Sequence, residues 1–396
     1  MNPFLAGADV RTITPRIDSG APPVFLAGFE GDRRAIGVEH DLCVRALAIS
    51  AGEGTRPFVL AVCDLIGLVR PDTLAIRSEV AELEADVVVA STHTHSGPDT
   101  IGLWGPDPAT RGVDEAWLAV TRGRVADAVR AAVEAMEPAS VRIATTTVDG
   151  VIANYRDPEI VDPQVGALAV DRRADGTAIA TLANVGCHPE VLDGGSTLLS
   201  PDMAGACARA LEGARGGVGF WVSGDLGGMQ SPVEGPRTPE EAERKGRRCA
   251  DAALAALADT PRDPDPAVRY RSDVVRLPLW NPSYRAGIAA GLLPGAVAPD
   301  GTIETEVGIL DLGSSRWVCW PGEVLPRLGV ESKRRLDTPF PFFVGLANDE
   351  LGYILDRDDF VEPADWDDPG DRYEESMSVG PDTGPLLLAA LDGLVR

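Results

Sequence analysis

The segment Asp86-Val-Val-Val-Ala-Ser-Thr-His-Thr-His-Ser-Gly-Pro98 is the most informative stretch of this sequence. Its Val-rich run predicts a buried β-strand over residues 86–92, and the Gly-Pro pair predicts a turn directly after it. On an extended chain, residues i and i+2 point to the same face, so His93 and His95 project together from the strand end. Ligands of α/β proteins bind in the crevice outside such strand ends. The segment therefore predicts a metal site, with a polar strand end that faces water as the alternative.

Strand-like and helix-like segments alternate along the rest of the chain. Apolar and β-branched runs predict strands at residues 58–68, 141–148, 166–170, 178–186, 218–222, 268–279, 303–312, 317–320 and 342–347. Helical spacing predicts helices at residues 70–83, 114–136, 201–213, 238–257, 322–335 and 384–395. This alternation is typical of an α/β or mixed α+β fold, in which helices flank mixed β-sheets. We expect one domain over residues 1–396, with the Pro- and Asp-rich stretch 259–266 as a surface loop or boundary.

Composition narrows the class of protein. The 396 residues carry 61 acidic and 36 basic side chains, for a net charge of −25. This balance argues against nucleic acids and anionic lipid surfaces as partners. No apolar run approaches the ~18 residues of a membrane helix, and the N-terminus lacks the basic and apolar regions of a signal peptide. Six scattered cysteines without a C-x-x-C motif predict buried, reduced thiols. We therefore expect a cytoplasmic protein that acts on a small molecule, and the oligomeric state stays open.

Further ligand-type side chains follow other predicted strands. His188 is the only other histidine at a strand end, so it is the natural third ligand, although alone it would be a hydrogen-bonded core residue. Glu323 follows a strand and starts a predicted helix, where a glutamate also simply faces the helix dipole. Tyr353, taken alone, is a core residue, and His40 at a loop-to-strand junction is structural.

Several short segments resemble, in order, the motifs of the neutral ceramidase family of metal-dependent amidases. The segment from Thr92 to Pro98 is similar to the family's T-H-T-H-S-G-P signature. The other similar segments are residues 7–15 (the opening), 154–156 (N-R-S), 184–188 (the second zinc histidine), 199–202 (S-x-D-N), 321–323 (P-G-E), 348–353 (the zinc tyrosine), and 373–375 with 380–383 (Y-E…G-P-x-T). The resemblance spans nearly the whole chain, and the ordered set is specific. It implies the family's catalytic fold of mixed sheets flanked by helices.

The resemblance also implies one Zn²⁺ ion held by two imidazoles, a carboxylate and a phenolate, those of His93, His188, Glu323 and Tyr353. It leaves His95 beside the metal, to transfer protons or to hold the tetrahedral intermediate. It gives Arg156 the role of orienting the substrate or stabilising developing negative charge. A zinc-bound water would have a pKa near ~7.

The chain departs from the family pattern in one motif. Where the family carries G-D-V-S-P with an active-site serine, this sequence reads Gly224-Asp-Leu-Gly-Gly-Met-Gln-Ser-Pro232. Gly227 takes the place of the serine, and Ser231 is a candidate substitute that arrives four residues late. Asp225 in the same segment is a candidate catalytic residue. The chain ends where the family's catalytic domain ends, so we expect no C-terminal immunoglobulin-like domain.

Acidic residues gather near the expected site. Asp99, Asp349 and Glu350, with Ser231, are candidate substrate-binding residues. They predict a pocket for a cationic or polyhydroxylated substrate, or for a second divalent ion, with solvated carboxylates as the alternative. We therefore expect a zinc-dependent hydrolase of a carboxamide or ester whose substrate is small and polar rather than ceramide. The alternatives are intramolecular acyl transfer or cyclisation in a biosynthetic pathway, and a metal- or ligand-binding protein without catalysis.

Overall fold

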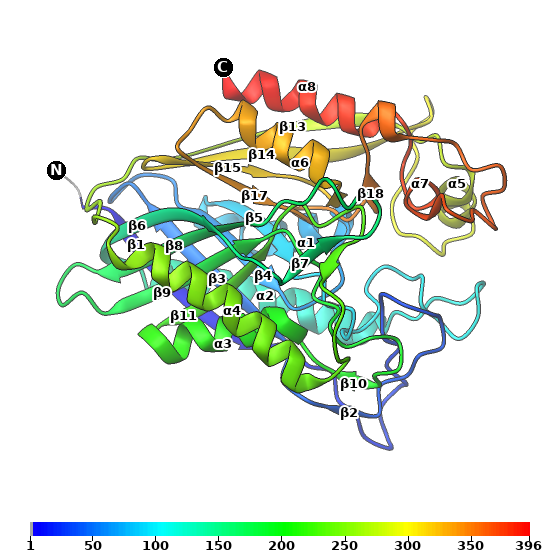
Figure 1. Ribbon diagram of the computed structural model, residues 1–396, viewed down its shortest axis with the longest axis horizontal. Coiled ribbons are helices and arrows are strands. Elements are labelled where there is room, and N and C mark those ends of the chain that lie inside the picture. The colour runs from blue at the N-terminus through cyan, green and yellow to red at the C-terminus, as the bar shows by residue number, and fades with distance from the viewer. Residues whose placement is uncertain (1–2) are drawn as a thin grey trace.

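The computed structural model describes residues 3–396 (Figure 1). Within them, the largest sheet has eight strands in the order β11-β9-β8-β6-β1-β3-β4-β5. The pairs β4–β5 and β9–β11 are parallel and the other neighbours are antiparallel, so the sheet is mixed. The strands are β1 (Leu5–Thr12), β3 (Cys43–Ser50), β4 (Phe58–Cys63), β5 (Asp86–Ser91), β6 (Glu137–Thr147), β8 (Gln164–Arg172), β9 (Ala178–Val185) and β11 (Val218–Ser223).

A second sheet in the described part of the chain has four strands in the order β13-β14-β15-β17. These are β13 (Val268–Pro278), β14 (Thr302–Leu312), β15 (Ser315–Cys319) and β17 (Phe340–Val344), of which β15 and β17 are parallel. Short two-stranded pairs join distant loops. They are β2 (Gly37–Val38) with β10 (Leu198–Leu199), β7 (Ile152–Asn154) with β12 (Gln230–Pro232), and β16 (Glu323–Val324) with β18 (Tyr353–Ile354).

Helices cover the outer face of each sheet, which makes four layers (Figure 1). Helices α2, α3 and α4 pack on the eight-stranded sheet, and α6 and α8 pack on the four-stranded sheet. The helices are α1 (Arg70–Glu79), α2 (Glu115–Glu134), α3 (Asp202–Arg215), α4 (Pro239–Ala258), α5 (Pro282–Ala289), α6 (Pro326–Arg335), α7 (Tyr373–Ser376) and α8 (Thr383–Val395), with short 3₁₀ turns η1 (Ala81–Leu83) and η2 (Arg357–Asp359).

The core lies between the two sheets and under the helices. On β4, Phe58 and Leu60 point into the cluster between the sheets, whereas Val59 and Ala61 point into the cluster under α2. Alternate side chains of a strand face opposite sides, so a strand buried on both faces is apolar throughout. The sheets approach closely at Gly166 of β8, where a Cβ atom would lie 2.5 Å from the Phe342 ring.

Most predicted elements are present, and the mixed fold of sheets flanked by helices is confirmed. Strands β1 and β3 were not predicted, because their sequences mix charged and small residues with apolar ones. The helix predicted at residues 322–335 is wrong in its first turn, since β16 precedes α6 and the helix begins at Pro326. Proline suits a first helical position because its missing N–H has no partner there. The stretch 259–266 connects α4 to β13, and so leads from one sheet to the other.

A curl of the large sheet gathers strand ends that are far apart in its strand order. β11 contacts β4 and β5 although they lie near the opposite end of that order. The Ser223 hydroxyl at the end of β11 donates to the Thr92 carbonyl at 2.7 Å. The segment after β17 joins both, since the Gly345 N–H donates to Ser223 O and the Asn348 N–H donates to Val89 O. The ends of β5, β11 and β17 therefore meet at one place.

Two features bear on the expectations from composition. Over residues 3–396, the helices are too short or too polar for any of them to cross a membrane. The six cysteines, all within this range, are free, and five of them are buried while Cys43 is partly exposed.

Candidate metal centre

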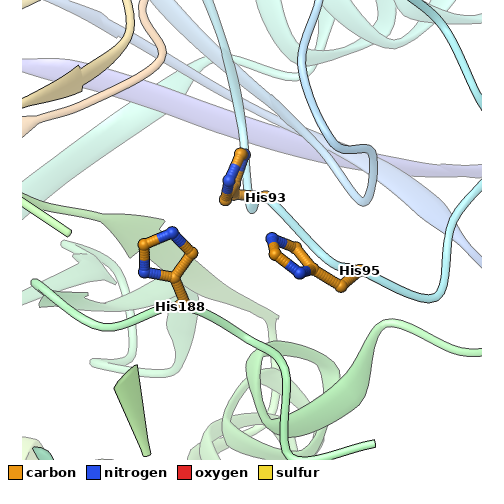
Figure 2. Close-up of side chains that lie close together, drawn as sticks. All are labelled: His93, His95 and His188. Carbon is orange, nitrogen blue, oxygen red and sulfur yellow. The ribbon is translucent and has the colours of Figure 1, made fainter. Parts of the chain in front are cut away.

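Three buried histidines point toward one another (Figure 2). His93 and His95 come from the segment after β5, and His188 comes from the segment after β9. One ligand nitrogen from each ring lies within 4.8 Å of the other two. The structure thus brings together the three histidines that the sequence places at strand ends, and the grouping could hold a metal ion.

Glu323 completes an arrangement of nitrogen and oxygen donors. Its Oε2 lies 3.0 Å from His188 Nε2 and 3.4 Å from His93 Nε2. The other ring nitrogens face backbone carbonyls, with His93 Nδ1 2.6 Å from Ile66 O and His188 Nδ1 3.1 Å from Gln230 O. Carbonyls only accept hydrogen bonds, so each Nδ1 carries a proton, and each Nε2 is directed at the Glu323 carboxylate. This is the tautomer in which histidine binds metals through Nε2.

The electrostatics of Glu323 reflect these neighbours. Burial acts to raise its pKa, but His93 and His188 hold the pKa well below its ordinary value. Burial likewise acts to lower the pKa of His188, and the contact with Glu323 raises it instead. A carboxylate and imidazoles that stabilise charge on each other form a donor set that suits Zn²⁺.

Tyr353 lies beside this group. It is the register partner of Glu323 in the β16–β18 pair, is 5% exposed and lines the same cavity. Among the residues that the structure describes, the hydrogen bond given for its hydroxyl is to Met229 Sδ at 3.6 Å, and sulfur is a weak acceptor. Burial raises the Tyr353 pKa well above its ordinary value. The residues present therefore fit a divalent metal ion, which would favour the ionised phenol.

His95 differs from the other two histidines. Its Nδ1 lies 3.2 Å from the Glu190 carboxylate, and neither ring nitrogen has a well-aligned hydrogen-bond partner among the described residues. Burial lowers the pKa of His95 to about 4, so the ring is a neutral imidazole near neutral pH. Burial acts to raise the pKa of Glu190, but the contact with His95 and the charge of His188 lower it to about 2. The pair is thus a carboxylate beside a neutral imidazole.

The group opens onto a cavity of about 550 Å³. His93, His95, Glu190, Glu323 and Glu350 are among its polar lining residues. Most of the wall is apolar, and much of it comes from the loop after β5 and from the segment around α5, through side chains that include Leu103, Trp104, Leu279, Ile288 and Val297. This lining differs from the polar pocket that the grouped acids led us to expect.

Hydrogen bonds within the protein explain the difference for two of these acids. The Asp99 carboxylate accepts the backbone N–H groups of Ile101, Gly102, Trp104 and Gly112, so it holds the loop after β5. The Asp349 carboxylate accepts the Arg70 N–H at 2.8 Å and the Thr305 hydroxyl at 2.9 Å, and burial raises its pKa to about 6. Buried carboxylates require such partners, so neither acid directs a free charge at a ligand.

Glu350 is the exception. Its Oε1 accepts the Gly352 N–H at 2.9 Å, but its buried Oε2 has no partner in the described part of the chain. The side chain packs on Gly67, where a Cβ atom would lie 2.6 Å from Glu350 Cγ. Burial raises the pKa of this carboxyl well above its ordinary value.

Comparison with solved structures places this geometry in a known fold. The crystal structure of a neutral ceramidase from Pseudomonas aeruginosa matches with a TM-score of 0.79 and 17% sequence identity, covering 100% of this chain and 74% of that chain. A structure of a ceramidase complexed with C2 matches with a TM-score of 0.80 and 16% identity, covering 100% of this chain and 75% of that one. The chain has the neutral ceramidase fold. No protein-family profile and no curated protein matches the sequence.

Within the neutral ceramidase fold, three predicted catalytic or substrate-binding residues besides Asp99 do not line the cavity. The Arg156 guanidinium pairs with Glu374 and Glu375 at 2.8 Å, which links the predicted N-R-S and Y-E segments. Asp225 Oδ1 lies 3.3 Å from the Lys333 ammonium. Ser231 is buried in β12, with its hydroxyl beside the Glu190 carboxylate. Arg156, Asp225 and Ser231 are thus outside the set of described residues that line the cavity.

The missing serine has a structural reason. A Cβ atom on Gly227 would lie 2.4 Å from the Glu323 carbonyl oxygen and 2.8 Å from the Val324 carbonyl carbon. The Gly227 N–H also donates to Val324 O at 2.9 Å. Only glycine therefore allows this loop to lie against β16, the strand that carries Glu323.

Two residues beside the centre escaped the sequence analysis. Glu190 follows His188 by two residues, so its spacing is the signal that could have indicated it. Gln230 is fully buried, and its carbonyl faces the backbone N–H and Nδ1 of His188. Its side chain also bonds Gly186 O and the Asp162 N–H. No local pattern distinguishes such a glutamine, because its partners come from distant segments.

Proposed function

We propose that this protein is a metal-dependent hydrolase that cleaves a carboxamide bond of a small-molecule substrate. One observation carries the proposal: His93 Nε2, His188 Nε2 and Glu323 Oε2 converge beside a cavity large enough for a small molecule. The solved proteins that share the fold are ceramidases. Their name supports amide cleavage as the reaction class for this chain.

In this proposal, Zn²⁺ is held by two imidazoles, a carboxylate and a phenolate, those of His93, His188, Glu323 and Tyr353. When bound, such an ion polarises a carbonyl group and lowers the pKa of a bound water. His95 accepts or donates the proton that must move when the amide nitrogen leaves. The apolar walls exclude other water, which strengthens each electrostatic contact inside the cavity.

The size and lining of the cavity also indicate the size and polarity of the substrate. Its volume of about 550 Å³ lies within the range of sites that enclose a whole small ligand. Side chains such as Trp104 and Leu279 suit an apolar part of that ligand, and the open oxygen of Glu350 suits a hydrogen-bonding group. We propose a short amide with an apolar part and a polar group rather than a long-chain ceramide.

A substrate series tests the proposal on the full chain. Acetyl, octanoyl and palmitoyl amides of one amine would be compared by kcat/KM, alongside long-chain ceramide. We expect turnover that disappears with a chelator and returns with Zn²⁺, and kcat/KM values that favour the shorter amides. Metal-replete protein that cleaves no amide would overturn the proposal in favour of a binding protein, and preference for long-chain ceramide would overturn its substrate part.

A further inference from the structure

Glu190 and His95 come from different loops, and these loops contact each other through one backbone hydrogen bond and one pair of side chains. The His95 backbone N–H donates to the Pro189 carbonyl at 3.3 Å. The side chains then meet where His95 Nδ1 lies 3.2 Å from Glu190 Oε2. Both residues are 7% exposed, and both line the cavity. A carboxylate in this place therefore faces both the imidazole and the space that a substrate would occupy.

Other contacts restrict His95 but leave its ring nitrogens unassigned. The Arg33 guanidinium donates to the His95 carbonyl. Gly28 has φ +98°, and a Cβ atom there would lie 2.3 Å from His95 Cγ, so the Gly28 backbone closes one side of the ring. The Phe29 ring meets the imidazole edge-on with centroids 5.0 Å apart. These contacts limit where the ring can lie, yet none of them selects which nitrogen carries the proton.

The Glu190 carboxylate determines which ring nitrogen of His95 carries the proton. An ionised carboxylate only accepts hydrogen bonds, so the nitrogen that faces it must be the donor. With the proton on Nδ1, the Nε2 atom keeps its lone pair and is directed toward the other two histidines (Figure 2). The same relation, with a backbone carbonyl in place of the carboxylate, sets the tautomers of His93 and His188.

We propose that Glu190 is a positioning residue that holds His95 as its Nδ1–H tautomer, with Nε2 free to accept a proton in the cavity. Glu190 acts through His95 and needs no contact with the reacting atoms. The catalytic part of this inference rests on the proposed amide hydrolysis, whereas the tautomer can be measured without any substrate.

Nuclear magnetic resonance tests the tautomer directly. The chain has only four histidines, so ¹⁵N-histidine labelling gives few signals, and the signal absent from His95→Ala belongs to His95. We expect the Nδ1–H form of His95 in the native protein and in Glu190→Gln, whose amide oxygen still accepts. In Glu190→Ala, we expect a shift toward the Nε2–H form, which free imidazole side chains favour. An unchanged tautomer in Glu190→Ala would overturn the inference.

Kinetics and metal content test whether Glu190 affects catalysis through His95. We expect Glu190→Ala to lower kcat by roughly 10–100-fold, the range for partners that orient another site residue, with KM and metal content unchanged. In a His95→Ala background, Glu190→Ala should not lower kcat further, because Glu190 acts through the imidazole that this background lacks. Additive losses, or loss of metal in Glu190→Ala, would overturn the inference.

A matched control separates this role from loss of a buried charge. Glu241 on α4 is 8% exposed, pairs with Arg244 and lies outside the cavity, and Glu241→Gln should leave kcat unchanged. If wild-type protein cleaves no amide, the proposed function fails, and the resonance experiment still decides whether Glu190 sets the tautomer of His95.

Discussion

Glu323 and Tyr353 are register partners in the short parallel pair β16–β18. The Glu323 N–H donates to Gly352 O at 2.9 Å, and the Leu325 N–H donates to Ile354 O at 3.1 Å. These backbone bonds hold two segments side by side that follow different strands of the smaller sheet. The carboxyl and phenol groups thereby reach the same cavity as His93 and His95, which follow β5 of the larger sheet.

Removal of one donor should empty the proposed metal site. We expect Glu323→Ala and His188→Ala each to lose zinc and amidase activity together, because the remaining donors bind weakly. Elemental analysis and turnover would be measured on the same samples, with Glu331→Ala at a partly exposed position of α6 as the control. Full zinc occupancy in Glu323→Ala would exclude this residue from the site.

His95→Ala should have a different effect. We expect the metal to remain and the rate to fall by roughly 10²–10⁴, the usual range for a group that transfers protons. The measurement is again zinc content together with kcat. Because His95 lies within ligand distance of His93 and His188, a metal-free His95→Ala protein would show instead that His95 is a ligand.

Gly227→Ser should not restore a family-like serine. The new Cβ atom would meet the Glu323 carbonyl oxygen at 2.4 Å, so β16 would have to move. We expect a loss of about 1–3 kcal/mol of unfolding free energy, as for other overpacked sites, and reduced zinc occupancy. Gly213→Ala on α3 is the control, since no atom lies within 4 Å of the added Cβ. Full zinc binding and a catalytic gain in Gly227→Ser would contradict this reasoning.

Asp349 makes stability depend on pH. Burial raises its pKa in the folded protein from 3.8 to about 6, so the folded state keeps a proton that the unfolded state releases. The stabilisation from this proton is present below the unfolded pKa and is lost as the pH rises through the folded pKa. A shift of this size corresponds to about 3 kcal/mol.

Asp349→Asn mimics the protonated carboxyl at every pH. We expect its stability advantage over wild type, measured by urea unfolding, to be larger at about pH 7.5 than at about pH 5. The Asp300→Asn variant at an exposed loop is the control, because the pKa of Asp300 is lowered rather than raised. An advantage of the same size at both pH values would contradict the assignment.

One domain over the whole chain remains a prediction. Side chains of both sheets share one core cluster, which includes Leu168 and Phe220 from the larger sheet and Trp317 and Phe342 from the smaller one. Neither half would keep that cluster alone. We expect limited proteolysis within residues 259–266 to yield fragments that stay associated and unfold in one transition. Two separately stable halves would contradict this expectation.

Local sequence patterns determined much of what the structure contains. The Val-rich run before His93 and the turn signal after His95 are short-range features, and they predict the strand. The alternation expected for the two rings does not apply, because β5 ends at Ser91 and His93 has φ +67°, although the rings still meet. Proline at the first position of α4, after Thr238, likewise predicts where that helix begins. Such signals depend on neighbours along the chain, so the sequence alone determined the elements and placed the candidate ligands at their ends.

Only the tertiary structure decided which polar groups meet and which remain free. The curl of the large sheet brings β11 against β5 and, with the loop after β9, sets His188 beside His93. Asp349 and Glu350 are adjacent acids in the sequence. The Asp349 carboxylate accepts the distant Arg70 N–H and Thr305 hydroxyl, whereas Glu350 Oε2 has no partner among the described residues. Gly227 excludes a serine because another strand lies against it. These outcomes depend on long-range packing, which no local pattern encodes, because each partner is supplied by a segment far away in the chain.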